Sequence, residues 1–349
     1  MRKLKQAGAQ VLRTEEADKD GAPVLEVNNL CVEFRLRTGV VSAVSSLTYS
    51  LHSGETLAIV GESGSGKSVG ARAVLGLNPP SAKVTAGSAL LKGEDLLSMK
   101  EARRRQLRGE EIAMVAQNSS LNPVFSVGWQ IAEAFRVHRG SSRREGFVHA
   151  AELLDRVGIP GGKKRVNDYP YEFSGGMRQR VSIAMAMALE PSVLIADEPT
   201  TALDMTVQAQ IMTLLEEMRR QTGMGLILIT HDLGLVAENA DRVVVMYAGT
   251  ACETGEIEEV FTRPGHPYTL GLMSSVPDIY DKVTRLKPIV GSPPDLMKIP
   301  SGCPFHVRCE YAQPRCEVTL PTLHEIAPGR QSGCHRSDDI LEASGGIRH

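Results

Sequence analysis

The stretch TLAIVGESGSGKS, residues 56–68, decides the fold class of this chain. Its first part, Thr56–Gly61, is a short apolar run of the kind that forms a fully buried strand. Its second part, Gly61–Ser68, matches the pattern G-x-x-x-x-G-K-S/T of a phosphate-binding loop. Glycines let the backbone curl so that successive N–H groups point at one anion, and the following helix adds the positive end of its dipole. The stretch therefore predicts a strand, a loop and a helix that together hold nucleotide phosphates.

Two side chains of this loop have predicted roles of their own. Lys67 should reach the β- and γ-phosphates of a nucleotide, and the Ser68 hydroxyl should ligate Mg²⁺. An ordinary glycine-rich turn is the alternative, but the position between a buried strand and a helix argues against it. The residues expected to bind ATP here are Gly61, Glu62, Ser63, Gly64, Ser65, Gly66, Lys67, Ser68 and Val69.

A second buried strand ends in two acids, in the sequence SVLIADEPT at residues 192–200. A carboxylate at this position can hold the Mg²⁺ of a phosphate-loop site, and we assign that role to Asp197. Glu198 is one residue further on, where it can polarise water for attack on the γ-phosphate. A strand that merely turns polar as it leaves the core explains one acid more easily than two.

The remaining pattern predicts an α/β fold with a mainly parallel sheet covered by helices. A further buried strand is expected at Gly225–Thr230, and helical segments precede it and the acidic strand. Near the N-terminus, Val24–Phe34 reads as a strand and Val40–Leu51 as a strand pair. Residues 1–23 are polar and are expected to be disordered, and prolines recur after Arg263, which indicates a second module there.

Composition excludes several classes of protein. The chain has 349 residues, a net charge of −2 and 23% charged residues, so no bulk binding of nucleic acid is expected. No apolar run approaches the roughly 18 residues of a membrane-spanning helix, and the N-terminus lacks the apolar core of a signal peptide. We therefore expect a cytosolic protein.

Further motifs carry a family resemblance. The sequence FSGGMRQR at 173–180 lies ahead of the acidic strand, and together with the phosphate loop it resembles the ATP-binding subunit of an ABC transporter. The resemblance covers about Val24 to Arg263. It implies a P-loop NTPase core with a RecA-like parallel sheet, an antiparallel β subdomain and a helical subdomain. The implied nucleotide-binding domain spans 24–265, and its helical subdomain, about 119–171, docks onto the membrane subunits.

The resemblance also assigns roles to residues outside the loop. Gln117 matches the glutamine that touches Mg²⁺ and senses the membrane partner, so Mg²⁺ is expected at Ser68, Gln117 and Asp197. His231 matches a switch histidine that hydrogen-bonds the γ-phosphate. The catalytic set is thus Glu198, His231 and Gln117.

Other assignments concern the partner subunit and the base. The signature residues Ser174, Gly175, Gly176 and Met177 are expected to contact the ATP of the partner subunit, with N–H donors at a helix start. Asp204, in TTALD, matches the acid of a loop that crosses the dimer interface. Phe34 is the candidate for stacking on adenine, although a half-buried strand aromatic explains it equally well.

The C-terminal region, 266–349, indicates the branch of the family. Its sequences HPYT, GSPPDL and CPFHVRC resemble the extension of oligopeptide and dipeptide importers, whose relatives also move nickel. The resemblance implies a peripheral subunit on the cytoplasmic face of the membrane. Its expected partners are a second, different ATPase subunit, two transmembrane permease subunits and an extracytoplasmic substrate-binding protein. An ATPase for nickel or another small solute is the alternative, and a soluble ABC ATPase of DNA repair or translation is a weaker one.

Four of the six cysteines lie in this extension, with the spacing C-x5-C-x6-C-x17-C. Disulfides are disfavoured in the cytosol, and free thiols need no clustering. Zinc sites usually use tighter pairs, although His306 and His335 are possible additional ligands. A [4Fe–4S] cluster also takes four thiolates, and spacing does not decide between the metals. The family resemblance favours a structural [4Fe–4S] cluster, with zinc as the alternative, at Cys303, Cys309, Cys316 and Cys334.

Overall fold

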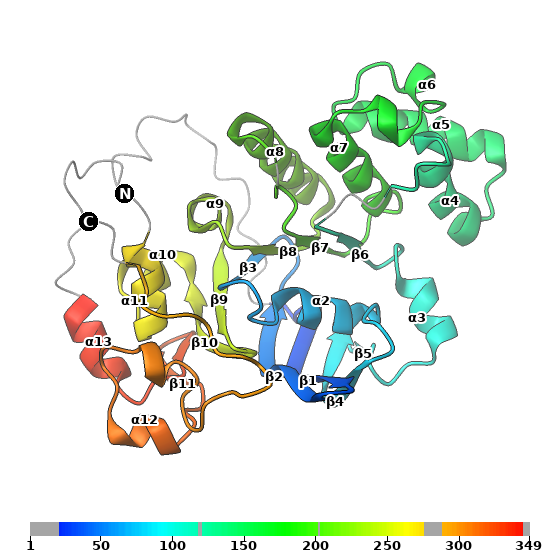
Figure 1. The fold of residues 1–349 in the computed structure, drawn as a ribbon. Helices are drawn as coiled ribbons and strands as arrows, with labels where there is room; N and C mark the ends of the chain where they lie inside the picture. The colour runs from blue at the N-terminus through cyan, green and yellow to red at the C-terminus, as the bar shows by residue number, and fades with distance from the viewer. Residues whose placement is uncertain (1–20, 118–120, 202, 276–287, 345–349) are drawn as a thin grey trace.

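The computed structural model describes residues 21–117, 121–201, 203–275 and 288–344, and its strands form two sheets (Figure 1). The larger sheet has eight strands in the order β11-β12-β10-β9-β3-β8-β7-β6. Its strands β9, β3, β8, β7 and β6 run parallel, which confirms the predicted α/β fold. Their bounds are β3 Thr56–Val60, β6 Ile112–Val115, β7 Val193–Asp197, β8 Gly225–Thr230 and β9 Arg242–Tyr247.

Strand β3 is an inner strand of the parallel set, between β8 and β9. Each of its five residues is buried, as the apolar run predicts. The phosphate loop follows directly and leads into helix α2, Lys67–Leu75. Because β7 and β8 run in the same direction, their ends at Asp197 and Thr230 lie at the same edge of the sheet as the loop.

The smaller sheet is antiparallel, in the order β2-β1-β4-β5. It contains β1 Leu25–Leu36, β2 Gly39–Leu51, β4 Ala82–Leu91 and β5 Glu94–Asp95, and its core packs against α2. The predicted strand pair at Val40–Leu51 is wrong, because these residues form one strand. Ser46 has a positive φ of 56° and the pairing shifts register around it, so the chain bends there without ending the strand.

A helical subdomain is inserted between β6 and β7 and lies at the upper right of Figure 1. Helix α5 begins with a capping box, in which Ser142 and Glu145 each bond the other's backbone N–H. Buried Ile131, Leu154 and Val181 join α4, α5 and α7 in one core. The helices are α4 Val127–Arg139, α5 Arg143–Arg156, α6 Gly162–Arg165 and α7 Gly175–Ala186.

Residues beyond the core domain pack on the far edge of the larger sheet. Strand β12, Arg330–Ser332, pairs antiparallel with β10, Thr250–Glu256, so the C-terminal extension continues the sheet of the nucleotide-binding core. An aromatic cluster packs the extension against the core: Tyr247 of β9 contacts Tyr268 and Phe305 of the extension. The other elements are α3 Glu101–Leu107, α8 Met205–Thr222, α9 Leu233–Asn239, α10 Ile257–Thr262, α11 Pro267–Ser274, η2 His306–Arg308, α12 Pro314–Val318, β11 His324–Ala327 and α13 Ser337–Ser344.

Within the described ranges, no helix is both long and apolar enough to pass through a bilayer. Of the expected N-terminal tail, residues 1–20 lie outside the described residues.

A buried ion pair ties the extension to β10. Arg330 Nη2 lies 2.7 Å from Glu253 Oε1, and the Glu253 side chain is fully buried. The same carboxylate accepts hydrogen bonds from the backbone N–H groups of Gly265 and His266. Burial raises the pKa of Glu253, and the bonds from Arg330 and Gly265 act against that shift.

Replacing Arg330 with Ala should lower the free energy of unfolding by about 3–5 kcal/mol, because the buried carboxylate of Glu253 then has no counter-charge. Urea denaturation of the full chain measures this change. The double variant Glu253→Gln/Arg330→Met removes both charges and should cost less than Arg330→Ala alone. A loss below about 1 kcal/mol for Arg330→Ala, the value of an exposed pair, would contradict the prediction.

Candidate functional site

The phosphate loop has a backbone that only glycine permits at two positions. Gly61 has a φ of 150°, and a Cβ there would lie 2.1 Å from the carbonyl oxygen of Met246. Gly66 has a φ of 98°, and a Cβ there would lie 2.3 Å from the carbonyl oxygen of Ala43. The loop is therefore packed tightly between β9 and β2, which fixes its shape.

Lys67 is held inside the loop. Its Nζ donates hydrogen bonds to the carbonyl oxygens of Gly61 at 2.7 Å and Glu62 at 2.9 Å, and to Ser65 Oγ at 3.3 Å. Burial lowers the pKa of Lys67, and the nearby carboxylates of Glu198 and Asp197 oppose that shift. The ammonium group is thus fixed within the curl of backbone that the sequence predicts to hold phosphates.

Two of the three residues expected at Mg²⁺, Ser68 and Asp197, meet at the start of α2. Ser68 Oγ donates to Asp197 Oδ1 at 2.6 Å, and the Asp197 side chain is buried. Among the described residues, Asp197 Oδ2 has no hydrogen-bond partner, and it lies 3.5 Å from the guanidinium of Arg72. Burial raises the pKa of Asp197, and the Ser68 hydroxyl opposes this. A hydroxyl beside a carboxylate with a free oxygen is a donor set that suits a hard cation, so these residues fit Mg²⁺.

Three side chains converge on the carboxylate of Glu198. Gln117 Nε2 donates to Glu198 Oε2 at 2.7 Å, and Thr201 Oγ1 donates to the same oxygen at 2.8 Å. His231 Nδ1 lies 3.4 Å from the other oxygen, Oε1. The expected catalytic residues Glu198, His231 and Gln117 are therefore brought together, with Gln117 on Glu198 rather than on Asp197.

The backbone at Glu198 is in the left-handed region, with a φ of 47°. Left-handed residues other than glycine are uncommon and concentrate at functional sites. Its N–H donates to the carbonyl of Ile229 on β8 at 2.8 Å, which holds the turn in place. The sequence did not predict that Thr201 belongs to this site. Thr201 lies three residues after Glu198 in the same turn, and this spacing is the sequence feature that could have identified it.

The signature residues form the start of helix α7. Ser174 is the N-cap and its Oγ accepts from the N–H of Met177 at 3.3 Å. At Gly176 a Cβ would lie 2.5 Å from Val207 on α8, so the glycine permits close packing of the two helices. Asp204 caps α8 in turn, accepting from the N–H of Val207 at 3.0 Å. These contacts are local to α7 and α8, and the expected contact of the signature with the partner subunit's ATP stays a prediction.

Phe34 lies on β1, opposite Val41 of β2 and Ala82 of β4, and is half-buried. Its expected stacking on adenine stays a prediction.

The four cysteines of the extension line one small cavity, of about 10 Å³, together with His306 and His335. Burial raises the pKa of Cys309 to about 11 and of Cys334 to about 12. In the described part of the chain, no three His, Cys, Asp or Glu side chains are grouped so that they could hold a metal ion. The expected [4Fe–4S] or zinc site is therefore not confirmed, although the clustering of the cysteines is.

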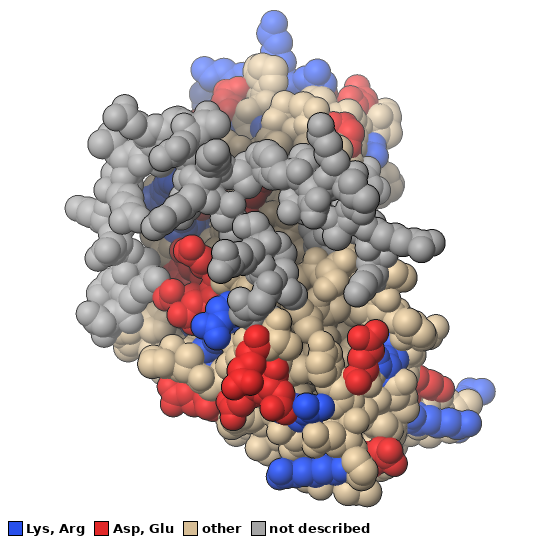
Figure 2. Space-filling model, turned by 90° about the vertical axis from the view of Figure 1, so that its left-hand side faces the viewer, with Lys and Arg blue, Asp and Glu red and all other residues tan. Residues whose placement is uncertain are grey.

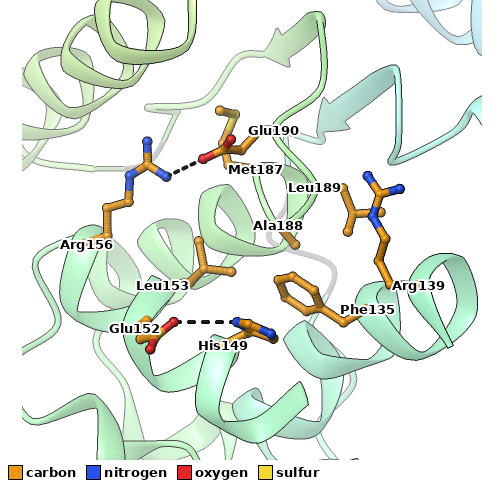
Figure 3. A pocket seen from close by; sticks show the side chains of 10 residues that line it. All are labelled: Phe135, Arg139, His149, Glu152, Leu153, Arg156, Met187, Ala188, Leu189 and Glu190. Atoms are coloured by element: carbon orange, nitrogen blue, oxygen red, sulfur yellow. Dashed lines mark hydrogen bonds and ion pairs between the residues drawn. The ribbon is translucent and has the colours of Figure 1, made fainter. Parts of the chain in front are cut away.

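A larger groove, of about 360 Å³, lies in the helical subdomain (Figure 3). It opens between α4, α5 and the end of α7, and the ion pair of Arg156 with Glu190, at 2.9 Å, joins α5 to the segment after α7. A second ion pair, His149 with Glu152 at 3.5 Å, lies along α5 on the groove wall. No residue of the phosphate loop or of the Glu198 cluster lines it, so it is separate from the candidate catalytic site.

The chain is similar in sequence to known transporter ATP-binding proteins. A family model described as ABC transporter matches residues 44–201, and one described as oligopeptide/dipeptide transporter, C-terminal region, matches residues 252–316. A Brucella abortus protein named as a peptide import ATP-binding protein is 51% identical over 90% of this chain and 95% of its own length. The oligopeptide transport ATP-binding protein OppD of Salmonella typhimurium is 47% identical over 93% of this chain and 97% of its own length.

The fold has a solved counterpart. The ATP-binding cassette MJ0796, in a dimeric post-hydrolysis state bound to ADP and phosphate, superposes with a TM-score of 0.61 at 25% identity. The match covers 67% of this chain and 98% of that one. With the phosphate loop, the acidic strand and the Glu198 cluster in place, the chain belongs to the ABC transporter ATP-binding proteins of the oligopeptide/dipeptide transporter family.

Proposed function

We propose that this chain hydrolyses ATP to drive the import of dipeptides or oligopeptides through a membrane complex. The proposed ATP hydrolysis is supported mainly by the contacts of Gln117, Thr201 and His231 with Glu198, at the edge of the sheet where the phosphate loop lies. The peptide part is supported by the match of residues 252–316 to the oligopeptide/dipeptide transporter region and by the names of the relatives.

In this proposal each residue of the site has a role in the reaction. The loop N–H groups and Lys67 bind the phosphates, and Ser68 and Asp197 hold Mg²⁺, which neutralises charge on the β- and γ-phosphates when bound. Glu198 orients the attacking water and accepts its proton. Gln117 and Thr201 hold the Glu198 carboxylate, and His231 contacts the γ-phosphate.

Replacing Glu198 with Gln should lower kcat for ATP hydrolysis by about 100-fold or more, because the amide cannot accept the proton of the attacking water. ATP affinity should remain close to that of the wild-type chain, since the phosphate contacts come from other residues. Single-turnover hydrolysis and equilibrium binding of ATP measure the two quantities. Unchanged hydrolysis would refute the assignment of Glu198 as the general base.

The proposed assembly has two different ATPase subunits, two permease subunits and an extracytoplasmic binding protein. In it, Ser174, Gly175, Gly176 and Met177 contact the nucleotide of the partner subunit, and Asp204 lies at the dimer interface. The chain is peripheral, on the cytoplasmic face of the membrane. A complex that is stimulated by nickel and not by a series of peptides would favour the alternative importer.

Nucleic acid is not a proposed partner. On the face in Figure 2, acidic and basic side chains are interspersed where described residues are visible. Nucleic-acid binding requires a continuous basic surface that neutralises phosphates.

The helical subdomain, about 119–171 within a nucleotide-binding domain of 24–265, is the proposed docking surface for the permease subunits. Support comes from large apolar side chains that it exposes to solvent. Their exposed fractions are 69% for Val124, 38% for Phe125, 65% for Val137, 51% for Val148 and 72% for Tyr171. Apolar side chains gathered on one subdomain commonly mark a protein interface.

The double variant Val137→Asp/Val148→Asp should abolish co-purification with the permease subunits, because it places two charges in the proposed apolar interface. Its nucleotide binding as a separate chain should be unchanged. Val318→Asp is the matched control, since Val318 is 76% exposed but lies in the 266–349 extension. Equal recovery of the permeases with all three proteins would exclude this docking surface.

We also propose that Cys303, Cys309, Cys316 and Cys334 hold a [4Fe–4S] cluster. Support comes from their position around one cavity. A single zinc ion, with Zn–S bonds of about 2.3 Å, requires all four sulfurs within roughly 4 Å of one another, whereas a cluster spreads them over four irons.

Anaerobically purified protein should contain iron and absorb in the visible range, and Cys316→Ser should lose both. Elemental analysis and absorbance spectra measure this. Zinc in place of iron would support the alternative metal, and the absence of both would refute a metal site.

A further inference from the structure

One side chain of the extension reaches into the phosphate loop. Arg308, in η2, forms a two-pronged ion pair with Glu62, the second residue of the loop. The distances are 2.7 Å from Nη1 to Glu62 Oε2 and 3.1 Å from Nη2 to Glu62 Oε1. The Arg308 side chain is 4% exposed and that of Glu62 is 27% exposed. Such paired, charge-assisted bonds are strong and fix the relative orientation of both groups.

The rest of the guanidinium is fixed as well. Its Nε donates to the carbonyl of Val290 at 3.0 Å and its Nη2 to that of Gly291 at 3.3 Å. Nη1 also donates to the Tyr247 hydroxyl at 3.2 Å, and the group lies 5.7 Å from the Tyr247 ring and 5.9 Å from the Phe305 ring. With so many partners, Arg308 has one orientation, and the Glu62 carboxylate must adapt to it.

The extension holds the backbone of Glu62 too. The N–H of Glu62 donates to the hydroxyl of Tyr268 at 2.8 Å, and Tyr268 is fully buried on α11. The carbonyl of Glu62 accepts from Lys67 Nζ at 2.9 Å. Residues beyond 266 therefore fix Glu62 at both its N–H and its carboxylate, and Glu62 in turn contacts the lysine expected to bind phosphate.

The charge of Glu62 makes this contact relevant to nucleotide binding. A carboxylate on a loop that binds a polyanion repels it unless a cation neutralises the carboxylate. Arg308 supplies that cation from outside the loop. We propose that Arg308 is a positioning residue for the phosphate loop, through which the C-terminal extension sets the affinity of the chain for ATP. The proposal rests on the ATPase function proposed above.

Arg308→Ala should weaken ATP binding by about 5- to 150-fold, the usual range for coupling between two sites. Binding is measured with radiolabelled ATP and the full chain, in a Glu198→Gln background to prevent turnover. The single-turnover rate at saturating ATP, measured with Glu198 intact, should change much less. Arg308→Lys keeps the positive charge but cannot form the paired hydrogen bonds to Glu62, so it should restore part of the ATP affinity that Arg308→Ala loses.

Two further variants separate positioning from stability. Ser332→Ala removes a buried hydrogen bond from the extension to Gly265, at the end of the nucleotide-binding domain, without touching Glu62, and should leave ATP affinity unchanged. In a Glu62→Gln background, Arg308→Ala should lose most of its effect on affinity, because the charge it neutralises is gone. Unchanged affinity in Arg308→Ala, or additive effects in the double variant, would overturn the proposal. If the unaltered chain bound no ATP, the ATPase function itself would fail instead.

Discussion

Parallel pairing of β3 between β8 and β9 is the constraint on which the site depends. Parallel strands present their carboxyl ends at one edge of a sheet, and ligands of such folds bind there. The phosphate loop follows β3, Asp197 ends β7 with Glu198 directly after it, and His231 follows β8. Because these strands are buried on both faces, their register is fixed, and the side chains that follow them meet without further adjustment. Gln117 joins them from the end of β6, the neighbour of β7.

This dependence explains which features were predictable from the sequence. Glu198 and His231 follow the two buried strands that were predicted from apolar runs, so the pattern that locates each strand also locates its side chain. Gln117 was assigned by the family resemblance, because no strand was predicted ahead of it. Lys67 and Ser68 were predictable because the loop demands particular residues at a fixed spacing. The parallel core was predictable for the same reason, since buried strands in alternation with helices allow few other arrangements.

Other features depend on contacts between distant parts of the chain, and local patterns do not encode those. Arg308 and Glu62 are 246 residues apart, and neither stands out from its neighbours in the sequence. Strand β12, which pairs with β10, has only three residues. That is too short for the alternation of buried and exposed residues that identifies a strand in a sequence. At Ser46 the polar residues within Val40–Leu51 imitate a turn, whereas the strand only bends there. Thr201 acts through a local turn whose geometry depends on the left-handed Glu198.

The buried ion pairs change how the cysteine cavity should be understood. A charge pair withdrawn from water adds little stability over an apolar pair, but it tolerates only one arrangement of its partners. Glu253 with Arg330, and Glu62 with Arg308, therefore specify where the extension lies on the core rather than simply holding it there. Arg308 directly precedes Cys309, and Phe305, which packs against Arg308, lies between Cys303 and Cys309. Whatever fixes the cysteines also fixes the turn that carries Arg308, so the cavity and the phosphate loop are two ends of one continuous set of contacts.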